Sequence, residues 1–338
     1  MDRSPSYRLE PQETALHQPH GTAGVAIPTP HAAAGVASPW QHDPGIPFRH
    51  SGWARNRELV HAALVACGVS DARLNSFEVC GSETWVLRDP DDPDHYRLAG
   101  NFCHDRFCKP CAGQRSRRIA ANLRKYLQPH AYRFLTLTLR SDTESLADLL
   151  NLLLRSFRTL RRTEWWRHLV RGGCGFVEIK WSQHKQRWHP HLHVILESAW
   201  LEKSLISGTW YRITGQSFIV DIRPIRDTDA AIGYITKYAS KPLNNTFLAR
   251  PERLQEAITA LGGRRLCMTF GTWVAWKLYD LPEKNEWFPV CSLRELLNRV
   301  ASGHPGATRI FNCLRNTLRH EQTATRCNGP PRDDDDHW

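Results

Sequence analysis

The feature that most restricts the fold is an alternation of polar and apolar side chains over residues 187–197, RWHPHLHVILE. His189, His191 and His193 occupy every second position, and mostly apolar residues stand between them. Alternate residues of a β-strand point to the same face of a sheet, about 7 Å apart. The alternation therefore predicts a strand with one face in an apolar core and one face of imidazoles.

Residues 174–181, CGFVEIKW, predict the partner strand of a hairpin. Across such a hairpin Glu178 approaches His191 and His193 and supplies a carboxylate. Two imidazoles and a carboxylate leave open positions on a divalent cation, as a Lewis-acid site requires. We therefore predict that these three residues bind a metal ion, with His189 as a bystander at the strand entrance.

Other strands and helices alternate around this hairpin. Strands are expected at 132–140 and 217–225, and helices at 141–162, 205–215 and 229–241. The first of these helices is expected to begin with a capping box, SDTE. This order predicts an α+β domain with helices on one face of a central antiparallel sheet, as in ferredoxin-like folds.

The chain before this domain has shorter elements. Residues 1–50 contain eight Pro, seven Ala and five His with little apolar periodicity, which predicts a disordered leader. The periodicity then predicts a helix at 56–68, short strands at 77–80 and 83–88, and a basic helix from 114 to 127.

The sequence YITKYASK places Tyr234, Lys237, Tyr238 and Lys241 on one stripe of a helix. A stripe facing a core would use Leu or Ile, whereas this stripe offers phenols and ammoniums. Tyrosine can act as a covalent nucleophile, and nearby cations favour its phenolate. Beside a metal site, the stripe predicts attack on a phosphodiester that releases a 3′-hydroxyl and leaves a 5′-phosphotyrosyl link. The alternative is an ordinary solvent-exposed helix face.

Cysteines cluster before the basic helix. Cys103, Cys108 and Cys111 lie in CHDRFCKPC, and the C-x₂-C spacing suits tetrahedral zinc. Cys80 is the expected fourth ligand rather than His104, because a residue adjacent to Cys103 rarely chelates the same ion. The alternative is a group of reduced structural cysteines.

The charge of the chain predicts an anionic partner. Lys and Arg number 45 against 34 acidic residues, and residues 103–125 hold seven of them against one Asp. We expect Arg115, Arg117 and Arg118 of the basic helix to contact phosphates, together with Lys241. No run reaches the ~18 apolar residues of a membrane helix, and no signal peptide is visible, so we expect a cytoplasmic protein without a membrane partner.

Three of these motifs, in this order, resemble those of the HUH endonucleases, most closely the rolling-circle replication initiator (Rep) proteins of small plasmids. FLTLTL is similar to their first strand motif, HPHLHVIL to their His-hydrophobic-His motif and YITKYASK to their tyrosine motif. The resemblance covers roughly residues 75–280. It implies an α+β HUH nuclease domain with a ferredoxin- or RRM-like antiparallel palm flanked by helices, preceded by a small Cys-rich, zinc-binding element.

The resemblance also implies roles for residues. His191 and His193 bind Mg²⁺ or Mn²⁺, Tyr238 is the nucleophile, and Lys237 holds the phosphate or lowers the phenol pKa. Many plasmid initiators have Glu four residues before the tyrosine, where this chain has Tyr234. Two-tyrosine phage initiators and transposases share that departure, so Tyr234 is either a second nucleophile or a packing residue.

We therefore expect an enzyme that nicks and rejoins one strand at a plasmid origin, single-stranded or cruciform, to start rolling-circle replication. A host helicase, DNA polymerase and single-strand binding protein are expected partners, because the sequence has no Walker-type loop. The alternatives are a two-tyrosine HUH transposase and a catalytically inactive, zinc-stapled DNA-binding regulator. The expected parts are a disordered leader (1–52), a helical, Cys-rich DNA-binding region (53–130), the nickase domain (131–280) and a C-terminal helix with a disordered tail (281–338).

Overall fold

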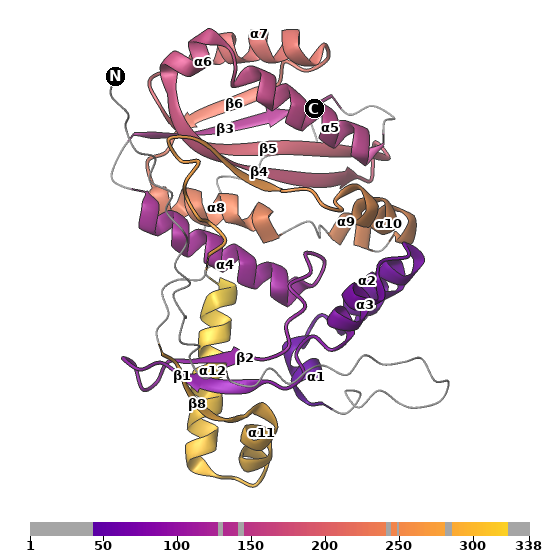
Figure 1. The fold of residues 1–338 in the computed structure, drawn as a ribbon, viewed down its shortest axis with the longest axis vertical. Helices are drawn as coiled ribbons and strands as arrows, with labels where there is room; N and C mark the ends of the chain where they lie inside the picture. Colours follow the sequence, from indigo (N-terminus) through magenta and orange to yellow (C-terminus); the bar gives the residue numbers. More distant parts are fainter. Residues whose placement is uncertain are drawn as a thin grey trace, which may run out of the picture. The chain divides into compact units, whose positions relative to one another are not determined.

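The computed structural model describes residues 43–127, 131–140, 145–240, 245–248, 250–280 and 286–323. The side chains of residues 237–240, 245–246 and 317–323 lie outside this description. The fold is α+β, as the sequence predicts, and it contains two antiparallel sheets flanked by helices rather than one (Figure 1). None of the helices in the described part is both long and apolar enough to cross a membrane.

The larger sheet has five strands in the order β6-β3-β5-β4-β7, and each neighbouring pair is antiparallel. Its strands are β3 (Tyr132–Thr138), β4 (Val170–Ser182), β5 (Arg187–Ser198), β6 (Val220–Pro224) and β7 (Cys267–Gly271). The predicted histidine strand is β5, and its hairpin with β4 pairs Glu178 with His191. Leu192 and Val194, which alternate with the histidines, are fully buried on the opposite face of the sheet.

Helices cover both faces of this sheet, so the expectation of helices on one face is wrong (Figure 1). On one face lie α5 (Leu146–Leu160) and α7 (Lys203–Thr214), whose apolar residues pack on the leucines of β3 and β5. On the histidine face lies α8 (Thr228–Ser240), backed by α4 (Lys109–Tyr126). Ile232 and Ile235 of α8 pack with Phe176 and Ile195 of the sheet. The second layer forms because Phe176 and Ile195 continue the histidine face as apolar surface.

Strand β7 is an edge strand that the sequence analysis did not predict. It pairs with β4 at Gly172 and Gly173, and it is preceded by α9 (Asn245–Leu248) and α10 (Pro251–Ala260). A Cβ on Gly173 would lie 2.4 Å from the Ile195 carbonyl oxygen and 2.7 Å from the Phe270 ring. The absence of a side chain at Gly173 therefore lets the Phe270 ring pack directly against β4.

The smaller sheet has the order β2-β1-β8. The hairpin of β1 (Trp85–Arg88) and β2 (Tyr96–Ala99) is completed by β8 (Phe288–Ser292) from far along the chain. After β8 come α11 (Leu293–Ala301) and α12 (Pro305–Thr323), in place of the single C-terminal helix expected. Val86, Tyr96, Cys291, Leu296 and Leu314 form a separate apolar core beneath this sheet.

Several predicted boundaries are wrong. Residues 77–80, expected as a strand, form the end of α3 (Asp71–Glu78) and the turn after it, and α3 follows α2 (Ala54–Ala66). The basic helix α4 begins at Lys109 rather than 114, since Pro110 suits a first helical turn. The cap of α5 is Ser145, whose hydroxyl accepts from the Asp148 N–H at 3.2 Å; the SDTE segment expected as a capping box lies outside the described residues.

A leader was expected at residues 1–52, and residues 1–42 of it lie outside the described part of the chain. Its last part forms α1 (Gly45–Arg49) instead of continuing as a leader. The short helix α6 (Glu164–Leu169) completes the described elements.

Candidate functional site

The first candidate site lies on the β4–β5 hairpin, on the face of the sheet that α8 covers. One carboxylate oxygen of Glu178, Oε2, is 3.0 Å from Nε2 of His193 and 3.4 Å from Nδ1 of His191. All three side chains are buried, and their ligand atoms lie within 4.8 Å of one another. His189 stands one step further along β5, with its ring 4.3 Å from that of His191, and does not join this group.

The surroundings favour an ionised carboxylate at Glu178 and a neutral imidazole at His193. Burial alone would raise the pKa of Glu178, but hydrogen bonds from His191 and His193 lower it well below its usual range. Burial lowers the pKa of His193. Burial, together with the charges of His191 and nearby lysines, lowers the pKa of His189 to about 3. Carboxylates and neutral imidazoles are the forms that bind divalent cations.

One nitrogen of this group has no hydrogen-bond partner within the described structure. It is Nε2 of His191, and it is buried. A buried polar atom without a partner costs about 1–3 kcal/mol, which a bound cation would offset. The two imidazoles and the carboxylate therefore fit a divalent metal ion, and the donor set alone does not fix which one.

Two further residues, for which the sequence predicted no role, adjoin this group. The hydroxyl oxygen of Thr136 on β3 is 3.2 Å from Nδ1 of His193. Nζ of Lys180 is 3.7 Å from Oε2 of Glu178. Both follow from strand periodicity, because Thr136 pairs with His193 and Lys180 lies two residues from Glu178 on the same strand.

Of the predicted catalytic residues Tyr234, Lys237 and Tyr238, Tyr234 is the one whose side chain the structure describes. Its ring centroid lies 6.0 Å from that of His193 and 5.4 Å from that of Phe134 on β3, edge-on in both cases. Lys237 and Tyr238 follow in the next turn of α8, but their side chains lie outside the described part of the chain, as does all of Lys241. The described part thus brings one of the two tyrosines against the histidine cluster.

The second candidate site is the group of four cysteines. Sγ of Cys80 lies 3.8 Å from Sγ of Cys108 and 3.7 Å from Sγ of Cys111. Sγ of Cys103 lies 3.6 Å from Sγ of Cys111, and all four thiols are free of disulfides. A zinc ion with Zn–S bonds of about 2.3 Å sets its sulfurs about 3.8 Å apart in a tetrahedron. The four thiols therefore match tetrahedral metal coordination, with Cys80 rather than His104 in the fourth position.

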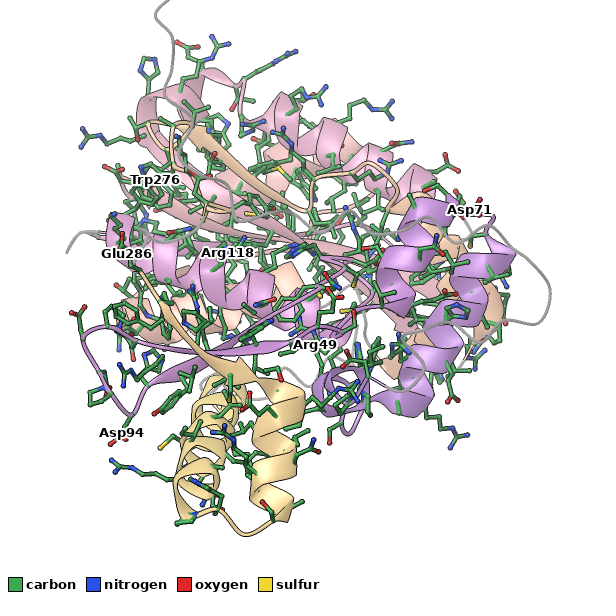
Figure 2. The ribbon with its side chains drawn as sticks, turned by 60° about the horizontal axis from the view of Figure 1, so that its bottom comes forward. Arg49, Asp71, Asp94, Arg118, Trp276 and Glu286 are labelled. Carbon is green, nitrogen blue, oxygen red and sulfur yellow. The ribbon has the colours of Figure 1, made fainter. Side chains whose placement is uncertain are left out.

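Residues from α1 support the cysteines, although the sequence analysis assigned this segment to the leader. Arg49 donates from Nη2 to Sγ of Cys111 at 3.3 Å, and its guanidinium lies 3.6 Å above the ring of Phe102 (Figure 2). Nε2 of His50 is 3.0 Å from the carbonyl oxygen of Cys80. A guanidinium beside a thiolate offsets its negative charge, so the end of the predicted leader belongs to the cysteine site.

The α4 arginines predicted to contact DNA are half-buried, and two of them hold neighbouring backbone. Arg115 donates to the carbonyl oxygen of His104 in the cysteine loop, and Arg118 donates to that of Tyr279 at 3.4 Å (Figure 2). Arg115 also lines a cavity of about 290 Å³, together with Arg73 and Arg106. Contact with phosphates stays a prediction for Arg115, Arg118 and their neighbour on α4, Arg117.

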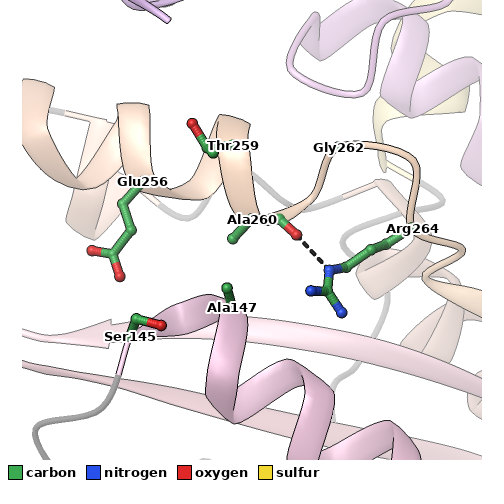
Figure 3. A pocket seen from close by; sticks show the side chains of 7 residues that line it. All are labelled: Ser145, Ala147, Glu256, Thr259, Ala260, Gly262 and Arg264. Atoms are coloured by element: carbon green, nitrogen blue, oxygen red, sulfur yellow. Dashed lines mark hydrogen bonds between the residues drawn. The ribbon is translucent and has the colours of Figure 1, made fainter.

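A cavity of about 340 Å³ lies between the start of α5 and the end of α10 (Figure 3). Its polar groups are already engaged: Glu256 accepts from the Leu146 N–H at 2.9 Å, and Arg264 donates to the Ala260 carbonyl and to Asn151. These bonds tie α10 to α5. The cavity includes none of the predicted metal ligands.

Comparison with known proteins places the chain in a family. The sequence profile of the replication protein family (Rep_1) matches residues 96–287, more than half of the 338-residue chain. A curated relative, "Protein rep" of Streptococcus pneumoniae serotype 2, is 26% identical over 221 residues, which cover 56% of this chain and 68% of the relative.

Other relatives are more distant or shorter in their overlap. "Protein rep" of Staphylococcus aureus is 23% identical over 172 residues, 49% of this chain and 74% of the relative. "Protein rep" of Bacillus amyloliquefaciens is 28% identical over 159 residues, 44% of this chain and 47% of the relative. No solved structure matches significantly. By the extent of the profile match, the chain belongs to the replication protein family.

Proposed function

We propose that this chain starts rolling-circle replication of a plasmid by nicking and rejoining one DNA strand through a 5′-phosphotyrosine. The observation that carries the proposal is the convergence of Glu178, His191 and His193 beside the tyrosine-bearing helix α8. Membership of the replication protein family makes DNA the fitting substrate of that site.

In this proposal the five-stranded sheet is the palm of an HUH nuclease, similar in type to ferredoxin and RRM folds. Its hairpin presents the ligands on one face, where α8 supplies the tyrosines. The proposed parts are the leader (1–52), the Cys-rich DNA-binding region (53–130), the nickase domain (131–280) and the C-terminal part (281–338). Pairing of β1 with β8 joins the second and fourth parts.

Glu178, His191 and His193 would hold Mg²⁺ or Mn²⁺. The bound cation would polarise the scissile phosphodiester and stabilise negative charge on its oxygens. We expect Mn²⁺ to support activity at least as well as Mg²⁺, because imidazole ligands favour the softer cation. The four cysteines would hold a structural zinc ion.

Tyr238 is the proposed nucleophile. Its phenolate oxygen attacks phosphorus, the bond from phosphorus to the 3′-oxygen breaks, and that oxygen takes a proton as it leaves. Lys237 holds the phosphate or favours the phenolate. The direction of α8 supports this assignment: Tyr234 lies beside His193, while Phe247 beyond α8 contacts Trp188 at the start of β5. The helix therefore runs from the His193 end of β5 towards the end where His191 lies.

The position of Tyr234 favours a second candidate. Its ring lies 6.0 Å from that of His193, so both tyrosines could alternate as nucleophiles, as in a two-tyrosine HUH transposase. In either case Arg115, Arg117, Arg118 and Lys241 would contact the DNA backbone. A host helicase, DNA polymerase and single-strand binding protein would act with the chain in the cytoplasm.

A covalent-adduct assay tests the proposal. Purified protein and Mn²⁺ are incubated with supercoiled plasmid carrying the DNA that flanks the gene, and peptide mapping locates the attached nucleotide. We expect an adduct on Tyr238 that is lost in Tyr238→Phe and in the double variant His191→Ala/His193→Ala. A second adduct on Tyr234 would favour the two-tyrosine cycle. Binding without any nick or adduct would contradict the proposal in favour of an inactive regulator.

A further inference from the structure

The C-terminal element lies beyond the segment shared with the replication protein family, whose profile match ends at residue 287. It is nevertheless part of the fold, because β8 pairs with β1 and both following helices pack on the smaller sheet. The role of this element is therefore not covered by the nicking site or by the family match.

The two helices are joined by a short turn. Helix α11 ends at Ala301 and α12 begins at Pro305, so three residues connect them. Gly303 in the turn has φ of +77°, a left-handed conformation that favours glycine. Nδ1 of His304 accepts from the Ala307 N–H at 3.3 Å and so caps the second helix. A three- or four-residue turn with glycine is typical of helix–turn–helix units.

Helix α12 has two distinct faces. Ala307, Ile310, Phe311 and Leu314 face the core of the smaller sheet. The opposite face is exposed, and it contains the stripe of residues at i, i+3 and i+7: Arg309, Asn312 and Asn316. This stripe is about 10 Å long, the length of roughly three base pairs.

The chemistry of the exposed stripe matches base edges in a major groove. Arginine pairs with guanine and asparagine with adenine, each through two hydrogen bonds. Residues 305–316 contain no Asp or Glu, and Arg315 is exposed at the flank of the stripe. A solvated face without a binding role more often mixes both signs of charge.

Asp94, at the turn of the β1–β2 hairpin (Figure 2), pairs with one of these side chains. Its carboxylate oxygens lie 2.9 and 3.1 Å from Nη2 of Arg309. Both partners are largely exposed, so the pair contributes little, on the order of 0–1 kcal/mol. Arg309 can therefore exchange Asp94 for a base or a phosphate at low cost.

We infer that α11 and α12 form a helix–turn–helix that binds duplex DNA. Arg309, Asn312 and Asn316 contact base edges in the major groove, and Arg315 contacts a phosphate. The inference rests on the proposed function, and it assigns selection of the origin duplex to an element separate from the metal centre.

Fluorescence anisotropy with the full chain tests this. Labelled duplexes tiled across the DNA that flanks the gene are compared with an unrelated duplex of equal length. In Asn312→Ala/Asn316→Ala, affinity for the best-bound duplex falls at least about tenfold, while affinity for the unrelated duplex changes less than about twofold. Arg315→Ala weakens binding to both the best-bound and the unrelated duplex. It also reduces the slope of log affinity against log salt concentration by about one. Gln183→Ala, which truncates an exposed carboxamide in the turn between β4 and β5, serves as the control and binds as the parent does.

Two outcomes would overturn the inference. One is a parent protein with no preference among the tiled and unrelated duplexes. The other is equal discrimination by the parent and by Asn312→Ala/Asn316→Ala; the two single variants provide the same readout if the double variant fails to fold.

Nicking of single-stranded oligonucleotides from the same region by the parent protein is scored separately. A parent that selects one duplex but nicks nothing contradicts the proposed function alone. A parent that nicks, with duplex selection unchanged in the variants, contradicts this inference alone.

Discussion

Glu178 connects the two histidines of the candidate metal centre, because one of its oxygens lies within 3.4 Å of a nitrogen of each. In Glu178→Gln the side chain keeps its size and loses its charge. We expect the affinity for Mn²⁺ to fall by about a hundredfold or more, since loss of an outer partner alone costs 10–100-fold. Electron paramagnetic resonance of free Mn²⁺ measures this. Glu164→Gln, on the exposed side of α6, should bind as the parent does, and equal affinities of the two variants would contradict the ligand role.

We predict that the Thr136 hydroxyl orients the His193 ring for metal binding. When Nε2 of His193 donates its lone pair to a cation, the ring proton sits on Nδ1, and the Thr136 hydroxyl 3.2 Å away can accept it. Thr136→Val removes that acceptor at nearly constant volume, so we expect Mn²⁺ affinity to fall about 10–100-fold. Thr136→Ser keeps the hydroxyl and should restore most of the affinity. Similar losses in both variants would contradict the prediction, because Thr136→Ser keeps the hydroxyl.

The histidine strand also predicts a pH dependence of stability. The pKa of His189 falls from 6.5 to about 3 on folding. Between these pH values the unfolded chain therefore binds a proton at His189 that the folded chain does not bind. The resulting stability is complete above pH 6.5 and is lost as the pH falls towards 3. Urea unfolding in EDTA should therefore show a smaller loss over this window in His189→Asn than in the parent. His168→Asn, at an exposed position of α6, should follow the parent, and three equal slopes would refute the prediction.

At the scale of elements, the β4–β5 hairpin was predictable because polar and apolar residues alternate with a period of two along β5. The same period brings Glu178 to the histidines, since cross-strand neighbours follow once the turn is fixed. Strands β7 and β8 were not predictable in this way. Their partners lie far away in the sequence, and CMTFG and FPVCS carry no clear alternation of their own. Which residue caps α5 was also undetermined locally, because Ser141 and Ser145 both offer a hydroxyl.

The cysteine loop and the start of α4 form one element, because Cys108 is the N-cap of α4 and Cys111 lies in its first turn. The proposed zinc ion would therefore stabilise the start of the helix. Hydrogen bonds from Cys103 and Cys108 lower the pKa of Cys111 to about 7, which favours its thiolate. Cys111→Ser should lose bound zinc and several kcal/mol of folding free energy. Elemental analysis of the purified protein and a thermal melt measure both quantities. Cys67→Ser, outside this group, should keep its zinc, and zinc retained by Cys111→Ser would exclude the four-cysteine site.

At the scale of the whole molecule, the described chain has a separate small core beneath the β2-β1-β8 sheet. Leu314 of α12 is fully buried there. Leu314→Ala should lower the free energy of unfolding of this part by about 2–5 kcal/mol, through lost burial and a residual cavity. Binding of Mn²⁺ at the larger sheet should stay unchanged. Denaturant unfolding measures this loss of stability, and Asn298→Ala is the exposed control. A Leu314→Ala variant as stable as the parent would contradict the burial of Leu314.

The pairing of β1 with β8 has a consequence for synthesis on the ribosome. The hairpin of β1 and β2 is complete at residue 99. Its free edge is paired, and its apolar face is covered, only by residues 288–314. At ordinary translation rates the intervening stretch of about 190 residues takes ~10–40 s to emerge. During that interval Val86 and Tyr96 are uncovered on the nascent chain, which makes them candidate chaperone contacts. The region that we infer selects duplex DNA thus matures only after the five-stranded sheet has all of its strands.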